Sequence, residues 1–276
     1  MSVFRAKSRF VQVDGIRTHY FESGEGFPLV LLHSGEFGGC AELSWEFNFE
    51  VLARHFRVLA PDWLGYGKTA KLFDFEDMRT RRVDHMTAFL RTLCIEKAHF
   101  MGNSMGATTL LEVAAMTEPP WPMDRIVAAS GGGTVPDNEA RQTLNSYDGS
   151  REHMKRVIEA LLSNPTIRSD PSYIHRRHRI SIAPGSWECI AAARFKRPDL
   201  KVGGMTRHIE YVNIKQPTLL VVGGLDTLRE PGYAEPLYAS IPNVEMHLMK
   251  EAGHCPNIDA PDEFNRVVVN FLTRPR

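Results

Sequence analysis

The sequence predicts an α/β fold with a mostly parallel central sheet, helices on both faces of that sheet, and an inserted helical segment. Short apolar runs of strand length alternate with stretches that have helical periodicity, which is typical of a covered parallel sheet. One stretch, residues 136–206, breaks this alternation. We therefore expect a core built from residues 1–135 and 207–276, with 136–206 as a helical lid.

The composition is that of an ordinary globular protein. The chain has 276 residues, of which 43% are hydrophobic and 24% charged, enough to bury a large core. The 33 basic residues balance the 33 acidic ones, so nothing favours nucleic acid or a membrane surface as a partner. The four cysteines are far apart and the N-terminus has no apolar signal segment. These features predict a cytoplasmic protein with free thiols.

The first elements are read from turn signals and apolar runs. Asp14-Gly15 between two alternating runs predicts a β-hairpin. The continuous apolar run 28–33 predicts a strand buried on both faces. Residues 43–56 are expected to form a helix, and 57–62 the next strand.

The middle of the chain continues the alternation. Residues 80–96 predict a helix, because apolar side chains including Val83 and Cys94 recur at helical spacing. A strand at 98–103 and a helix at 105–116 follow. The remaining core elements are strands at 125–130, 217–223 and 244–249 and a helix at 263–272.

The predicted lid contains helix-like pieces separated by prolines and no clear buried strand. These pieces are REHMKRVIEALLS, SYIHRRHRIS and SWECIAAARF. The functional interpretation of this segment is a lid over an active site. The alternative is a helical insertion with a purely structural role.

The segment Gly102-Asn103-Ser104-Met105-Gly106 fits the G-x-S-x-G pattern between a strand and a helix. In that pattern the serine sits on a sharp, strained turn, with its hydroxyl near the N-terminus of the helix. A glycine-rich loop without catalytic function is the alternative. A nucleophilic serine needs a general base and an acid that orients that base. The chain offers a candidate for each, which favours Ser104 as a nucleophile.

Asp226 follows the strand 217–223, and His254 lies in a Gly-His loop after the strand 244–249. The carboxyl ends of parallel strands meet at one edge of a sheet, which is where catalytic groups collect. The order serine, acid, histidine is the order that this architecture requires. We therefore predict a catalytic triad of Ser104, Asp226 and His254.

A tetrahedral intermediate needs two N–H donors for its oxyanion. The N–H of Met105, directly after the nucleophile, should supply one. The loop after strand 28–33 should supply the other, from Gly35 or alternatively from Ser34. His33 precedes the nucleophile and is expected to be a structural hydrogen-bonding residue.

With these residues identified, the chain resembles the α/β-hydrolase family over nearly its whole length, and most of all the meta-cleavage product hydrolases. The matching segments are LLHSGEFGG, VLAPDWLGYGKT, MGNSMG, RHRISIAPGSWE, GxxD at 223–226, GH at 253–254 and DEFNRVVVNFL. The resemblance implies cleavage of a carbon–carbon bond in a 2-hydroxy-6-oxo-dienoate. The chain departs from the family in the loop Ser34-Gly35-Glu36-Phe37 and in Cys255, where an aromatic residue is usual.

The resemblance also implies residues that bind the substrate. Arg177 falls where the family's carboxylate-binding arginine should be, although a solvated basic face is the alternative. Asn103 and Asn48 are expected near the 2-hydroxy end, and Ser34 and Cys255 are two further substrate-binding candidates. Cys255 is expected to be a small packed neighbour of His254 rather than a reactive thiol.

Two other functions stay open at this stage. A carboxylesterase would use the same triad without a carboxylate anchor. A binding protein or receptor would carry a triad that is vestigial or turns over only once. No metal or organic cofactor is implied. The expected partner is a small-molecule dienoate, and the resemblance implies a homo-oligomer.

Overall fold

The computed structural model describes residues 6–194 and 209–275, and all structural statements below concern these residues. An eight-stranded sheet has the order β1-β2-β4-β3-β5-β6-β7-β8. The strands are β1 Lys7–Val13, β2 Ile16–Ser23, β3 Pro28–Leu32, β4 Arg57–Pro61, β5 Ala98–Asn103, β6 Met123–Ala129, β7 Thr218–Gly223 and β8 Val244–Met249. All pairs from β4 to β8 are parallel, which confirms the predicted fold class.

The predicted hairpin is β1 and β2, which pair antiparallel with Val13 opposite Ile16. Asp14 and Gly15 both have positive φ, 47° and 79°, as a two-residue turn of this kind requires. Strand β2 then pairs antiparallel with β4 and attaches the hairpin to the edge of the sheet.

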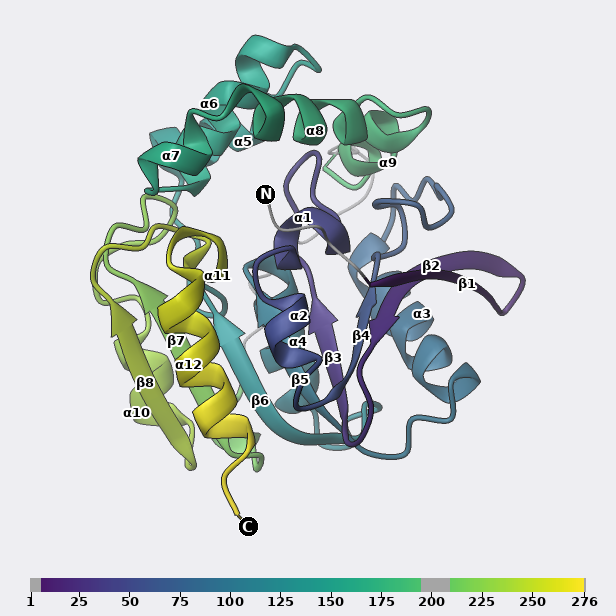
Figure 1. Ribbon diagram of the computed structural model, residues 1–276, viewed down its shortest axis with the longest axis vertical. Helices are drawn as coiled ribbons and strands as arrows, with labels where there is room; N and C mark the ends of the chain where they lie inside the picture. Colours follow the sequence, from purple (N-terminus) through teal and green to yellow (C-terminus); the bar gives the residue numbers. More distant parts are fainter. Residues whose placement is uncertain (1–5, 195–208, 276) are drawn as a thin grey trace.

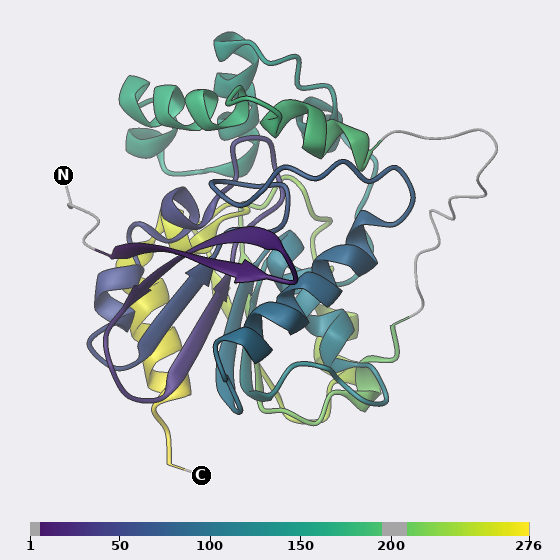
Figure 2. The ribbon, with the colours of Figure 1, turned by 90° about the vertical axis from the view of Figure 1, so that its right-hand side faces the viewer.

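Helices cover both faces of the sheet (Figures 1 and 2). The helices α1 Ala41–Trp45, α2 Phe49–Leu52, α11 Pro256–Asp259 and α12 Pro261–Leu272 cover one face. The other face is covered by α3 Met78–Thr92, α4 Met105–Ala114 and α10 Glu235–Ser240. In β3, Leu29 and Leu31 point into one apolar cluster, while Val30 and Leu32 point into the other. This two-sided burial explains the continuous apolar run.

Two predicted helices differ in the structure. The stretch 43–56 holds two short helices, α1 and α2, because the chain bends at the buried Asn48, whose side chain bonds to another part of the protein. The predicted helix 80–96 ends at Thr92. Cys94 follows with φ of 54° and is exposed, so its predicted place on the buried face was wrong.

Helices α5 Glu139–Asn145, α6 Arg151–Leu161, α7 Pro165–Arg168, α8 Pro171–Ser181 and α9 Ser186–Ala192 lie over the carboxyl ends of the strands (Figure 1). The three predicted pieces correspond to α6, α8 and α9, while α5 and α7 were not predicted. Residues 195–206 of the predicted lid lie outside the described residues, so its limits remain a prediction. No helix in the described part of the chain is long and apolar enough to cross a membrane.

Candidate active site

Ser104 lies on a tight turn between β5 and α4. Its backbone has φ 53° and ψ −112°, a strained conformation for a residue with a side chain. The turn is tight enough that a Cβ atom on Gly102 would lie 2.4 Å from the nitrogen of Ala107. A Cβ atom on Gly106 would lie 2.1 Å from the carbonyl oxygen of Leu32. Both glycines of the sequence pattern are therefore required by close backbone packing.

The structure brings Ser104, His254 and Asp226 together in one hydrogen-bonded chain. The Oγ atom of Ser104 lies 2.7 Å from Nε2 of His254, and Nδ1 of His254 lies 2.8 and 3.0 Å from the two carboxylate oxygens of Asp226. In this arrangement Nδ1 donates to Asp226, and Nε2 is left to accept the serine proton. This is the geometry of a nucleophile, a general base and an orienting acid.

The acid and the base are almost completely removed from water. The side chains of His254 and Asp226 are 3% and 2% exposed. Burial alone would raise the pKa of Asp226, but the charge and hydrogen bond of His254 and the N–H of Leu228 hold that pKa below its usual value. Asp226 is therefore ionised at neutral pH and can stabilise a protonated His254.

Gly35 and Met105 lie side by side next to Ser104. A Cβ atom on Gly35 would lie 2.5 Å from Sδ of Met105, so only glycine fits without moving that side chain. Neither backbone N–H donates to any described residue, whereas the N–H of Ser104 itself donates to Ala129. Both donors are therefore available for an oxyanion, and their role as an oxyanion hole stays a prediction.

A cavity of about 360 Å³ opens at Ser104 and His254, between the sheet and the helices above it. Apolar side chains such as Leu161, Ile190 and Leu228 line part of it. Five arginines and Glu36 are also among the described residues that line the cavity, so a largely apolar wall carries several charged groups. Within residues 6–194 and 209–275, no group of three or more His, Cys, Asp or Glu side chains is placed to hold a metal ion.

A family model described as the alpha/beta hydrolase family matches residues 29–267. The chain belongs to the α/β-hydrolase family.

Relatives of this α/β hydrolase match over nearly the full length of both chains. It is 30% identical to a 2-hydroxy-6-oxo-6-(2'-aminophenyl)hexa-2,4-dienoic acid hydrolase of Metapseudomonas resinovorans, over 96% of this chain and 91% of that protein. It is 29% identical to a 2-hydroxymuconate semialdehyde hydrolase of Pseudomonas sp. strain CF600, over 94% and 91%. A solved meta-cleavage product hydrolase from Pseudomonas fluorescens IP01 matches with a TM-score of 0.84 and 26% identity, over 96% and 97%.

The five residues that the resemblance implied for substrate binding do not line the cavity at Ser104. They are Ser34, Asn48, Asn103, Arg177 and Cys255, all buried. They bond to other protein groups, both side chains such as Glu36 and Asn265 and backbone carbonyls, and only Asn103 and Cys255 bond to each other. Their role in binding substrate remains a prediction, and each has an observed structural contact.

Asn48 differs most clearly from its expected place near the 2-hydroxy end of the substrate. Its side-chain amide donates to the carbonyl oxygen of Asn257 at 3.0 Å and to Oδ1 of Asn265 at 2.9 Å. The side chain is completely buried between α2 and the C-terminal helices. Asn48 therefore joins these helices and does not face the cavity.

Asn103 and Cys255 support the histidine loop. The amide of Asn103 donates to the carbonyl oxygen of His254 at 3.2 Å, and its Oδ1 accepts from the thiol of Cys255 at 3.6 Å. Burial raises the pKa of the Cys255 thiol well above its usual value. Cys255 is a packed neighbour of His254, as the sequence led us to expect.

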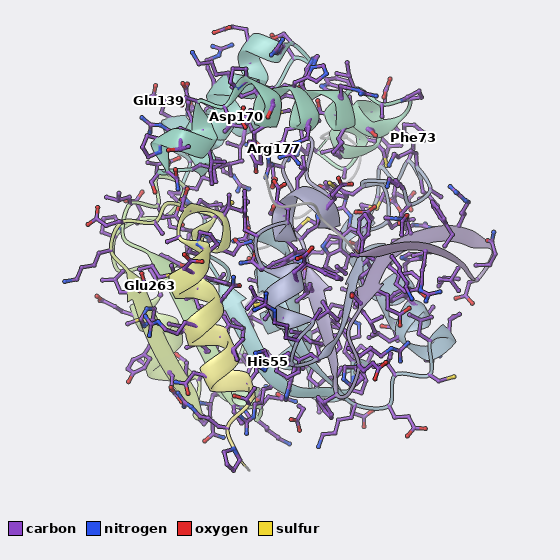
Figure 3. All side chains as sticks on the ribbon, in the orientation of Figure 1. His55, Phe73, Glu139, Asp170, Arg177 and Glu263 are labelled. Carbon is purple, nitrogen blue, oxygen red and sulfur yellow. The ribbon has the colours of Figure 1, made fainter. Side chains whose placement is uncertain are left out.

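Arg177 points from α8 toward the core, where it is labelled in Figure 3, and forms an ion pair with Glu36. Ser34 also hydrogen-bonds the Glu36 carboxylate. Burial would raise the pKa of Glu36, but Arg177 and Ser34 hold it below its usual value. The side chains of Arg177 and Glu36 are 0% and 2% exposed, so the pair is internal to the protein.

The cavity is also lined by Tyr66, Arg82 and Arg194, which were not predicted from the sequence. They come from a loop, from α3 and from the residues just after α9, and no spacing in the sequence links them. The one available signal was Glu36, which stands in a loop that is usually glycine-rich.

Proposed function

We propose that this α/β hydrolase cleaves the carbon–carbon bond next to the C6 ketone of a 2-hydroxy-6-oxo-hexa-2,4-dienoate. The products would be a 2-hydroxypentadienoate and a carboxylic acid. The hydrogen-bonded chain of Ser104, His254 and Asp226 beside a cavity carries the proposal. The full-length similarity to hydrolases of such dienoates supports the choice of substrate.

The reaction begins with ketonisation of the dienol, so that the electron pair of the breaking bond has an acceptor. Ser104 Oγ then attacks C6 while His254 Nε2 takes the serine proton. The oxyanion that forms accepts hydrogen bonds from the N–H groups of Met105 and Gly35.

Collapse of this intermediate breaks the C5–C6 bond. The electron pair of that bond passes through the C3=C4 double bond to the C2 oxygen, and this dienolate oxygen takes the proton from His254, which gives the 2-hydroxypentadienoate. Water activated by His254 then hydrolyses the acyl ester on Ser104 and releases the carboxylic acid. Direct attack of water on C6, with Ser104 only polarising the ketone, is the alternative order of the same bond changes.

The test is spectroscopic. Purified protein is mixed with the coloured dienolate 2-hydroxy-6-oxo-6-phenylhexa-2,4-dienoate, and a p-nitrophenyl ester is assayed in parallel. Fast bleaching that is lost in Ser104→Ala is the expected result. Fast ester cleavage without bleaching would instead identify a carboxylesterase. Binding of either compound without turnover would identify a receptor.

A cytoplasmic location and a homo-oligomeric state belong to the same proposal. They rest on the cysteine usage and on the family resemblance.

A further inference from the structure

The described residues that line the cavity at Ser104 carry more positive than negative charge. They include the arginines Arg79, Arg82, Arg141, Arg194 and Arg229 and one carboxylate, Glu36. Arg79 pairs with Glu112, and Arg229 donates to the backbone carbonyls of Ser130, Gly132 and Thr134. The other three form no ion pair with any carboxylate in the described part of the chain.

Arg82 lies beside Met105, the residue that follows the nucleophile Ser104. Its Nη1 atom is 3.5 Å from Sδ of Met105, and its guanidinium lies 5.0 Å from the centre of the Tyr66 ring. Its Nη2 atom is buried and has no hydrogen-bond acceptor among the described residues. A buried charged donor without an acceptor is unfavourable, and a ligand oxygen in the cavity would correct this.

Arg194 approaches the same place from the opposite wall. Its Nη2 atom donates to the carbonyl oxygen of Gly35 at 3.2 Å, and the hydroxyl of Tyr66 donates to that oxygen at 2.8 Å. The residue is exposed, although protein atoms lie around its guanidinium group. This crowding lowers the pKa of Arg194, and the charges of Arg141 and Arg82 lower it further.

The three cations thus line one cavity, and the only carboxylate among its described lining residues, Glu36, is already paired with Arg177. Arg141, on α5, faces the same cavity, and burial and the charge of Arg229 lower its pKa. Like charges repel unless a counter-charge is bound, and guanidinium groups match the geometry of a carboxylate. The arrangement is complete only with an anionic group in the cavity.

Arg177 is not available to bind an anionic group in the cavity. Glu36 stands between Arg177 and the cavity, since Glu36 lines the cavity and Arg177 does not. The Nε atom of Arg177 donates to the hydroxyl of Tyr173 at 3.0 Å, and its charge is matched by Glu36. Separating a buried ion pair leaves an uncompensated charge, which is strongly unfavourable.

We propose that Arg82, Arg141 and Arg194 form a carboxylate-binding subsite of the cavity, and that Glu36 withholds Arg177 from the substrate. The ligand is an ester or ketone whose carboxylate lies on either side of the reacting carbonyl. The inference rests on the proposed triad chemistry, and it adds which residues select an anionic substrate.

The test compares Arg82→Gln and Arg194→Gln with Arg179→Gln, a matched control that removes an exposed arginine of α8 outside the cavity. The substrates are p-nitrophenyl hemiglutarate, with a carboxylate on the acyl side, and the uncharged p-nitrophenyl valerate. The readout is the ratio of kcat/KM for the charged ester to that for the uncharged ester. A third arm measures KM for the phenyl-substituted dienoate, whose carboxylate is on the leaving side.

Loss of one charged hydrogen bond should lower the ester ratio roughly 10- to 100-fold in either cavity variant, if the carboxylate lies on the acyl side. If it lies on the leaving side, KM for the dienoate should rise by about the same factor while the ester ratio stays constant. The Arg179→Gln protein should stay within about twofold of the wild type in both assays. Thermal unfolding of each variant establishes that it is folded.

The subsite is overturned if both cavity variants behave like Arg179→Gln. It is also overturned if a folded Arg177→Gln protein alone loses selectivity for the charged compounds. Failure of the wild type to bleach the dienoate would count against the proposed function. The ester ratio would then test the subsite on the acyl side, and an unchanged ratio in both cavity variants would overturn it.

Discussion

Nδ1 of His254 donates to both carboxylate oxygens of Asp226, at 2.8 and 3.0 Å. This contact fixes the ring so that Nε2 faces Ser104. The acid comes from the end of β7 and the base from the loop after β8, neighbouring parallel strands. Their adjacency in the sheet allows two residues 28 positions apart to meet.

The first prediction concerns this contact. An amide in Asp226→Asn can hold His254 in the wrong tautomer, with its proton directed at Ser104. We expect kcat to fall about 10⁴-fold on both the dienoate and a p-nitrophenyl ester, with little change in KM. Steady-state kinetics on the two substrates measures this. A variant that retained more than about a tenth of the wild-type kcat would show that Asp226 is not the orienting acid.

The second prediction concerns the packing of the nucleophile turn. Gly106→Ala places a Cβ atom 2.1 Å from the carbonyl oxygen of Leu32, so α4 and β3 must separate. We expect about 3 kcal/mol of lost stability in urea unfolding.

Gly26→Ala is the matched control for the same substitution elsewhere. Its φ is +92° and nothing lies within 4 Å of the added Cβ atom, so only backbone strain of about 1 kcal/mol is expected. Equal losses in the two variants would contradict the explanation by close packing.

Different parts of the site were predictable from the sequence for different physical reasons. Ser104, Asp226 and His254 were placed correctly because strand order and the carboxyl edge of a parallel sheet bring them together. Asn48 was misplaced because its partners, Asn257 and Asn265, lie more than two hundred residues away and turn its side chain from the cavity.

The arginines of the cavity were not predictable in the same way. Arg82 and Arg194 meet only through the packing of α3 and the lid helices, which leaves no regular spacing in the sequence. The role of Glu36 depends equally on tertiary packing, since its partner Arg177 is 141 residues away. Such contacts between distant loops and helices are decided by the folded shape.

The third prediction concerns acid stability. Burial alone would raise the pKa of Asp62, but the hydrogen bond from His19 and the N–H of Lys68 help to lower it to about 2. The unfolded chain, with an ordinary pKa near 3.9, then binds the proton more tightly than the folded chain. The stability from Asp62 is therefore complete above about pH 5 and is lost as the pH falls toward about 2.

Urea unfolding of the wild type and of Asp62→Asn between about pH 7 and pH 3 tests this. We expect the variant to be roughly 2 kcal/mol less stable near neutral pH, and the difference to shrink as the pH falls. Asp84→Asn, which changes an exposed carboxylate, is the control. It should change neither the free energy of unfolding near neutral pH nor its dependence on pH. A difference that did not depend on pH would mean that Asp62 acts through packing alone.

The last prediction concerns the thiols, and above all Cys255 next to the catalytic histidine. Cys40, Cys189 and Cys255 are buried, and burial raises the pKa of each thiol, whereas Cys94 is exposed. Only the thiolate reacts with a disulfide reagent, and the reagent must also reach it. The native protein should therefore react quickly at Cys94, while the other three thiols should react only when the chain unfolds.

Titration with 5,5'-dithiobis(2-nitrobenzoate), with and without urea, measures the two classes of thiol. Cys94→Ser should remove the fast phase and leave ester hydrolysis unaffected by the reagent. A fast phase that persisted in Cys94→Ser and disappeared in Cys255→Ala would show that Cys255 is open to the cavity. The thiol would then be a reactive neighbour of His254, and its hydrogen bond to Asn103 would be too weak to keep it packed.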